Sequence, residues 1–239
     1  KIHEVLFWAT HGIKGVTVSD IEIKVAPQFH DNITSTQVHE ILIQGCADMI
    51  TEKTPNYQHV AANLLNFLLR KDVFGASDNL PPLQDVIEQN ISNKVYDDVV
   101  LKNYSKEEIK RLDNVIKHKR DYDFVYAGLQ QLIDKYLLKD RATSTLFETP
   151  QYMYMLICMT LLADIEDKNR RHSLIKNLYN DLSTFKISLP TPIMSGVRTP
   201  SRQYSSCTLI DVGDNLPSIF HSNTAVGYYT ANRAGIGLN

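Results

Sequence analysis

Apolar residues recur at helical spacing through the first 185 residues of the chain, and this pattern stops at Ile187. Thr34, Ser35 and Thr36 are cap candidates ahead of one such helix. Its apolar face consists of Val38, Ile41, Leu42, Cys46, Met49 and Ile50. A second helix opens at Pro55, and Gly75 is placed to end it. From Ile187 onward, short apolar pieces are separated by Pro, Gly and Ser. The pattern predicts a mainly helical chain with a different structure at its end.

More helices follow the second one before the pattern changes. Ser105 and Glu108 have the spacing of a capping box ahead of a helix with Ile109, Leu112 and Ile116 on its apolar face. Three further helices are predicted over residues 122–138, 150–165 and 173–185. After them, CTLIDVGD at 207–214 predicts a strand that ends at a turn, and residues 224–233 predict one more helix.

The clearest punctuation between helices is GASDNLPP at residues 75–82. With the change near residue 186, it divides the chain into an N-terminal module of residues 1–75, a helical domain of residues 76–185 and a final segment of residues 186–239. The chain opens at Lys1 without an initiating Met and stops in the glycine-rich stretch RAGIGLN. We therefore expect it to be a piece of a longer protein.

Composition excludes several classes of partner. The formal net charge of −2 gives no electrostatic case for nucleic acid or for an anionic membrane surface. The longest apolar run, residues 153–163, is too short for a bilayer, which needs about 20 residues, and predicts a buried helix. The first residues do not have the form of a signal peptide. Three cysteines are too few for a disulfide framework. We expect a soluble, cytoplasmic protein.

The segment Lys186–Cys207, KISLPTPIMSGVRTPSRQYSSC, carries the strongest sign of chemistry. Its framework is too apolar for a disordered linker, and it has too much Pro for a helix. In and just before it lie many hydroxyls: Ser183, Thr184, Ser188, Thr191, Ser195, Thr199, Ser201, Ser205 and Ser206. Hydroxyls and backbone N–H groups on a stiff loop suit an anionic phosphate. Cys207 would then lie beside whatever the phosphate belongs to.

Several residues have two interpretations from the residues alone. Cys207 is either a small buried hydrophobe at the start of a strand, which is commoner, or a redox thiol or nucleophile. Asp214 either caps the next turn or accepts a ribose hydroxyl. Gly235-x-Gly237 is either a tight turn or half of a phosphate-binding fingerprint. Arg70 and Lys71 either meet the helix dipole, the safer interpretation, or reach a nucleotide phosphate.

Two other sets of residues have simpler interpretations. The basic run is interpreted as a solvated helix face; it consists of Lys110, Arg111, Lys117, Lys119 and Arg120. His39 and the other histidines have no metal-ligand spacing, so no metal site is predicted.

Five strings identify a family resemblance in chain order. They are PNYQHVAANLL (55–65), KYLLKDR (135–141), QYMYMLICM (151–159), STFKISLPTPIMSGVRTPSRQYSSC (183–207) and RAGIGLN (233–239). They resemble the large, catalytic subunit of class I ribonucleotide reductases, of the enterobacterial and phage type. The resemblance implies an N-terminal fragment with a helical ATP-cone-like module, a helical domain and the start of a ten-stranded α/β barrel.

The resemblance also implies roles for residues in the final segment. Thr191 and Ser206 would bind the diphosphate of a ribonucleoside diphosphate substrate, and the turn at Ala234 and Gly235 would line it. Cys207 would be half of the dithiol that reduces the ribose 2′ position, with its partner outside the chain. A nucleoside triphosphate effector that selects the substrate would bind at the specificity residues Asp214, Asn215 and Leu216.

In the N-terminal module, the resemblance implies a site that senses ATP against dATP. Ser35, His39 and Lys71 fall at nucleotide-associated positions of the family. Gln37 and Leu68 stand where relatives carry Asp and His. The family's opening hairpin, which lies over the nucleotide, is absent from this chain.

The implied enzyme is a ribonucleoside-diphosphate reductase that works only as a full-length protein with partners. The chain itself would hold no cofactor, because a di-iron tyrosyl radical resides in a separate small subunit. Thioredoxin or glutaredoxin would supply electrons, and two large subunits would form a homodimer. The 239-residue chain alone is predicted to be inactive. The alternative is a non-catalytic nucleotide-binding module for regulation or assembly, and the sequence past Asn239 distinguishes the two.

Overall fold

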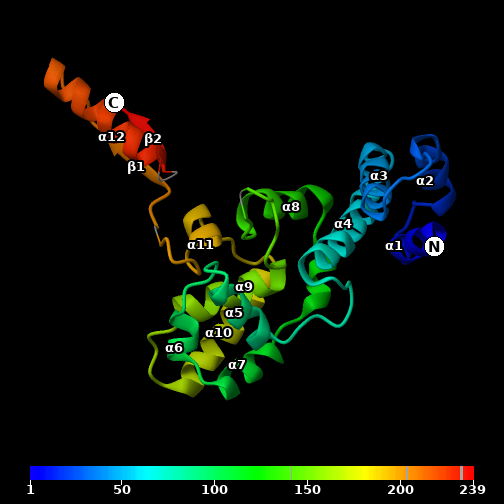
Figure 1. Ribbon diagram of the computed structural model, residues 1–239, viewed down its shortest axis with the longest axis horizontal. Helices are drawn as coiled ribbons and strands as arrows, with labels where there is room; N and C mark the ends of the chain where they lie inside the picture. Colours follow the sequence, from blue (N-terminus) through cyan, green and yellow to red (C-terminus); the bar gives the residue numbers. More distant parts are fainter. Residues whose placement is uncertain (141, 203, 232–233) are drawn as a thin grey trace.

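The computed structural model describes residues 1–140, 142–202, 204–231 and 234–239. Figure 1 shows N-terminal helices, a helical body, and a C-terminal helix with two short strands that projects from the body on an extended segment. The mainly helical fold is confirmed. No helix in these ranges is both long enough and apolar enough to cross a bilayer.

The N-terminal residues form four helices and one 3-10 turn. These are α1 (Ile2–Thr10), α2 (Val18–Val25), η1 (Ala26–Gln28), α3 (Ser35–Asp48) and α4 (Tyr57–Phe74). Thr34 caps α3 through a capping box with Gln37, as one of the three cap candidates predicted. Gly75 ends α4 in the left-handed region with φ 73°, where a side chain would be strained. The predicted start at Pro55 is two residues early, since Asn56 is the N-cap.

The helical body follows residue 82. Its elements are α5 (Leu83–Ser92), α6 (Val99–Asn103), α7 (Lys106–Asp113), η2 (His118–Asp123), α8 (Tyr126–Gln131), η3 (Leu132–Tyr136), α9 (Pro150–Leu161) and α10 (Lys168–Ser183). The Ser105 capping box of α7 is confirmed. The helix predicted over 122–138 is interrupted, because extended backbone at Phe124 and Val125 separates η2 from α8, and α8 then continues directly into the π-helical turn η3. Residues 150–159 of α9 are all buried, as the apolar run predicts.

Helix α4 packs against both α3 and α8, so it belongs to the N-terminal helices and to the body at once. Arg70 on α4 is buried and pairs with Asp121 of η2 at 3.0 Å between Nη2 and Oδ2. The same nitrogen donates to the backbone oxygen of His118 at 2.7 Å. Burial raises the pKa of Asp121 to about 6, although Arg70 opposes the shift.

These contacts correct two predictions about basic residues. The Arg70 guanidinium is occupied by the body, so it neither meets the dipole of α4 nor faces a nucleotide. The basic run is not one solvated helix face, because it crosses from α7 into η2. Arg120 donates to Asn180 Oδ1 at 2.9 Å and to Ser183 Oγ at 2.6 Å, and both acceptors lie on α10.

The Pro-rich segment contains a helix that the prolines had seemed to exclude: α11 (Thr191–Gly196). Pro190 is its N-cap residue and Pro192 lies in its first turn, where a backbone N–H has no helical partner to lose. Two residues beyond α11, Arg198 is buried and its Nε lies 3.1 Å and 3.0 Å from the two oxygens of buried Glu148. This ion pair attaches the segment to the body.

The final residues form a β–α–β unit. Strands β1 (Cys207–Ile210) and β2 (Gly235–Leu238) are parallel neighbours, and α12 (Leu216–Ala231) connects them. The strand is shorter than predicted, and α12 begins eight residues before the predicted Thr224. The early start has a local cause, since Asn215 Oδ1 accepts from the N–H of Ser218 at 2.9 Å. The predicted helix end at Arg233 lies outside the described residues, and the ten-stranded barrel stays a prediction.

Replacing Arg198 tests how the segment is held. In Arg198→Met, Glu148 keeps a buried charge without its partner, and we expect the free energy of unfolding to fall by about 3–5 kcal/mol. The matched control is Arg202→Met, which removes a partly exposed ion pair with Asp97 (2.7 Å) and costs less than about 1 kcal/mol. Urea unfolding measures both. Equal losses for the two variants would contradict the central role of the buried pair.

Candidate functional site

Four of the predicted substrate residues lie together where β1 and β2 begin; we name Ser206, Cys207, Ala234 and Gly235 the strand-start cluster. Cys207 pairs in register with Gly235. The Gly235 N–H donates to the Ser206 carbonyl oxygen at 3.0 Å, and Ser206 Oγ lies 3.8 Å from Cys207 Sγ. A hydroxyl, a thiol and a glycine turn therefore share one end of the strand pair.

Glycine at 235 is required by this close approach. A Cβ added there would lie 2.9 Å from the Ser206 carbonyl oxygen and 3.5 Å from the Cys207 sulfur. The N–H groups of Gly235 and Ala234 are already bound, to Ser206 and to the Tyr229 carbonyl respectively. The turn therefore offers a ligand no free backbone N–H at these two residues, and glycine at 235 serves the close approach of the two strands beside the thiol.

Cys207 is exposed, whereas Cys46 and Cys158 are buried. Burial raises the pKa of the Cys46 thiol to about 12 and also raises the pKa of Cys158. The interpretation of Cys207 as a buried hydrophobe is wrong: it does begin a strand, but its side chain faces outward at that edge of the fold. It is the accessible thiol of the described chain.

Thr191 lies apart from the strand-start cluster. It is the first residue of α11, and its Oγ1 is 3.4 Å from the hydroxyl of Tyr136. Figure 1 shows α11 against the helical body and β1 at the far end of the extended segment. The structure thus brings four of the five substrate residues together and leaves the fifth on the body.

The three specificity residues form the turn ahead of α12. Asn215 supplies the side-chain cap, so the interpretation of Asp214 as the cap is wrong. Leu216 begins α12 and is 67% exposed. Asn215 also lines a cavity of about 470 Å³ with Asp211 and His221.

Two of the three ATP-cone positions are close in space. His39 of α3 is buried, and its ring centroid lies 5.2 Å from that of Phe67 on α4. The ammonium of Lys71 lies 5.6 Å from the centre of the same Phe67 ring. Burial lowers the pKa of His39, and the charge of Lys71 lowers it further. Ser35 lies exposed one turn before His39 on α3.

The sequence analysis did not single out Phe67 of α4, whose ring lies near both His39 and Lys71. The signal was its position one turn before Lys71, on the same side of the helix. Gln37, a departure from the family pattern, has a local role: its side-chain oxygen accepts from the Thr34 N–H at 2.9 Å. Among the described residues, no group of three His, Cys, Asp or Glu could hold a metal ion.

The fold and these positions point to the ribonucleotide reductases. Residues 122–202 match the family model described as "Ribonucleotide reductase, all-alpha domain". Over all 239 residues the chain is 45% identical to the ribonucleoside-diphosphate reductase subunit alpha of Buchnera aphidicola subsp. Schizaphis graminum. It is 43% identical to ribonucleoside-diphosphate reductase 1 subunit alpha of Escherichia coli K12 and 41% identical to subunit alpha of Enterobacteria phage T4.

These comparisons confirm the resemblance that the motifs indicated. The whole chain is similar to alpha subunits of ribonucleoside-diphosphate reductase from enterobacteria and their phage. It spans about a third of the length of the curated relatives it matches, 31% in each of these three.

Alkylation tests the exposure of Cys207. We expect iodoacetamide to modify Cys207 in the native protein on the order of 100-fold faster than Cys46 or Cys158, since buried thiols react only when the fold opens. Peptide mass spectrometry after timed quenching gives the three rates. In Cys207→Ser the fast reaction should vanish, while in urea all three wild-type thiols should react. Comparable native rates would show the assignment of exposure to be wrong.

The pKa of His39 tests its proximity to Lys71. Because both burial and Lys71 lower it, Lys71→Met should raise the His39 pKa without bringing it to the ordinary value of about 6.5. A folded-state pKa below the unfolded one means that neutral His39 stabilises the fold at neutral pH. This contribution is lost as the pH falls below about 6.5. NMR titration of the imidazole measures the shift, and exposed Lys53→Met is the control. An unchanged pKa in Lys71→Met would contradict the geometry.

Proposed function

We propose that this chain is part of the large subunit of a ribonucleoside-diphosphate reductase, which makes deoxyribonucleoside diphosphates for DNA synthesis. The observation that carries the proposal is the exposed Cys207 in register with Gly235, in a chain 41–45% identical to alpha subunits over its whole length. Reduced cysteines of this kind suit the cytoplasm.

The diphosphate is held by hydroxyls in this proposal. Ser206 Oγ donates to it beside the thiol, and the bare Cα of Gly235 lets β2 approach Ser206 closely. Ala234 lines the same turn. Thr191 lies apart from this turn in the structure, and in the full-length protein it would contribute its hydroxyl from α11, where the nearby Tyr136 hydroxyl orients it. Holding the diphosphate at these points presents the ribose to Cys207 in one orientation.

The electrons come from Cys207 and a second cysteine elsewhere in the longer protein. A thiyl radical on a third cysteine removes the 3′ hydrogen and later returns it. The 2′ hydroxyl leaves as water, and the two thiols become a disulfide as the ribose gains two electrons and a hydrogen at C2′. A di-iron tyrosyl radical in a small subunit starts the reaction, and thioredoxin or glutaredoxin reduces the disulfide. The 239-residue chain alone lacks the second thiol and is inactive.

The turn before α12 is the effector site in this proposal. Asp214, Asn215 and Leu216 bind a nucleoside triphosphate that selects the substrate base. The exposed apolar side chains of Leu216, Ile219 and Phe220 share one face of α12 and support a homodimer through this helix. Two copies would then cover a face that is costly to leave in water.

The N-terminal module binds ATP or dATP in this proposal, through Ser35, His39 and Lys71. Lys71 supplies positive charge for a phosphate, and the Phe67 ring supplies a surface for a base. A second candidate function, a nucleotide-binding regulatory module without chemistry, is favoured by this cluster. Its residues all lie within the chain, whereas the other cysteines of the chain, Cys46 and Cys158, are buried.

Turnover of the full-length protein distinguishes the two functions. With a small subunit, a dithiol reductant and an ATP effector, we expect CDP to be converted to dCDP. Cys207→Ser should abolish the product, because one thiol cannot supply two electrons. Cys46→Ala, at a buried cysteine remote from this chemistry, is the control and should retain turnover. Chromatography of the nucleosides measures the yield.

Three outcomes of this experiment would each contradict one part of the proposal or favour the second candidate function. Retained dCDP formation in Cys207→Ser would contradict the assignment of Cys207 as a redox thiol of the reductase. ATP binding without dCDP formation in the full-length wild type would favour the regulatory module. Any dCDP from the 239-residue chain under the same conditions would contradict its predicted inactivity.

A further inference from the structure

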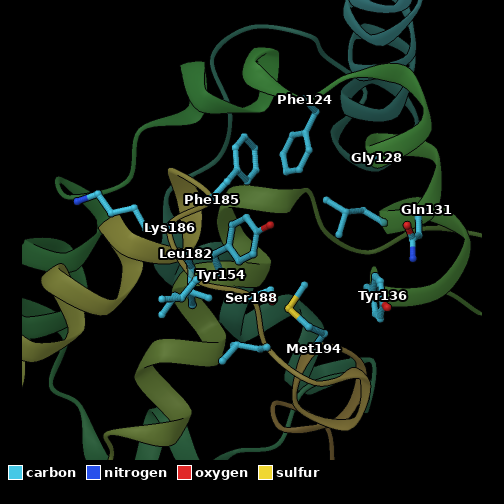
Figure 2. Close-up of a pocket in the computed structure, with 13 residues that line it drawn as sticks. Phe124, Gly128, Gln131, Tyr136, Tyr154, Leu182, Phe185, Lys186, Ser188 and Met194 are labelled. Carbon is cyan, nitrogen blue, oxygen red and sulfur yellow. The ribbon is translucent and has the colours of Figure 1, made fainter.

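A cavity of about 360 Å³ opens in the helical body, away from the strand-start cluster. Figure 2 shows it between α8 with η3 on one side and residues 185–189 with α11 on the other. Its principal lining residues are Phe124, Gly128, Tyr136, Tyr154, Phe185 and Met194. A volume of this size is within the range of sites for small molecules.

Tyr154 of α9 has a hydroxyl that lines this cavity without a protein partner. The residue is only 5% exposed, and its hydroxyl makes no hydrogen bond to any part of the chain that the structure describes. Figure 2 shows the oxygen directed toward the middle of the cavity. A hydroxyl that opens on a cavity and has no protein partner is available to a molecule that enters.

Other buried tyrosines of the same body show that this is an exception. Tyr96 donates to Glu148 at 2.7 Å, Tyr104 to the Met159 carbonyl at 2.7 Å, and Tyr179 to Gln151 at 2.6 Å. Tyr152, two residues from Tyr154 on α9, donates to the Pro81 carbonyl. The body therefore satisfies its buried phenols by protein contacts, and Tyr154 is left with the cavity.

Aromatic rings form the mouth of the cavity. The rings of Phe124 and Phe185 meet edge to face, with centroids 4.8 Å apart. Phe185 is half exposed and has φ 60°, a conformation that a bulky residue adopts only when its surroundings hold it there. Lys186 points away from the cavity in Figure 2 and pairs with Asp181 at 3.3 Å. The interior thus offers aromatic faces and uncharged polar groups rather than charge, and the uncharged polar lining residues besides Tyr154 are Gln131, Tyr136 and Ser188.

We propose that this cavity binds a neutral, planar aromatic molecule that carries one hydrogen-bonding group. The rings of Phe124 and Phe185 pack against its faces and edges, and the Tyr154 hydroxyl pairs with its polar group. The bound molecule also touches Met194 of α11 and Tyr136, which lies 3.4 Å from Thr191. The site is distinct from the nucleotide positions and from the strand-start cluster, and it adjoins Thr191 of the proposed function through Tyr136.

The probe pair 2-naphthol and naphthalene tests the proposal in the full-length protein. We expect saturable 1:1 binding of 2-naphthol by calorimetry. Tyr154→Phe should weaken the affinity for 2-naphthol by about 5-fold, which corresponds to the loss of one hydrogen bond. It should leave the affinity for naphthalene unchanged. Tyr126→Phe, on α8 but outside the cavity, is the control and should leave both probes unchanged.

Gly128 gives a second, independent variant. A Cβ there meets Phe124 and Val125 only at 3.8 Å, so Gly128→Leu fits the helix and fills the cavity. It should abolish binding while thermal unfolding shows an intact fold. Absence of saturable binding in the wild type would overturn the proposal. This holds also where a segment of the longer protein fills the cavity and so prevents binding. Binding that survives Gly128→Leu, or equal effects of Tyr154→Phe on both probes, would also overturn it.

Discussion

The buried ion pair of Glu148 and Arg198 holds the Pro-rich segment Lys186–Cys207 to the helical body. Glu148 accepts hydrogen bonds from Tyr96 and from the Leu138 N–H, and Arg198 donates onward to the Tyr136 carbonyl. Two charges can stay out of water only when their remaining hydrogen-bonding capacity is met in this way. The position of α11, and with it Thr191 and the wall of the aromatic cavity, follows from this network.

A second buried pair has the same role at the other end of the body. Arg70 and Lys71 are consecutive on α4, and successive helical residues point in different directions. Arg70 therefore pairs with Asp121 in the body, while Lys71 lies over Phe67 beside His39. One helix thus carries both the anchor and the candidate nucleotide residues. In the β–α–β unit, by contrast, β1 and β2 are joined at the strand-start cluster by a backbone hydrogen bond from Gly235 to Ser206.

The candidate sites differ in how much of each could be predicted from the sequence. The motif strings indicated a resemblance to ribonucleotide reductase large subunits, and the comparisons confirmed that similarity. Neighbouring residues such as Ser206 and Cys207 needed no structure to be placed together. Their meeting with Ala234 and Gly235 across 28 residues followed from the family resemblance, and the strand register supplies its physical form. The only local sign of Phe67 was its position one turn before Lys71, and nothing in the local pattern distinguishes Tyr154 from an ordinary core aromatic.

The sequence by itself determined the features that depend on neighbours within about four residues. The capping boxes at Thr34 and Ser105, the glycine end of α4 and the buried face of α9 are of this kind. Tertiary structure decided which buried polar groups found partners. Arg70 meets Asp121 across 51 residues and Arg198 meets Glu148 across 50, while Tyr154 meets none in the described chain. The reason is physical: helix caps are closed by the local backbone, whereas a buried charge or hydroxyl is satisfied only by what folding brings to it.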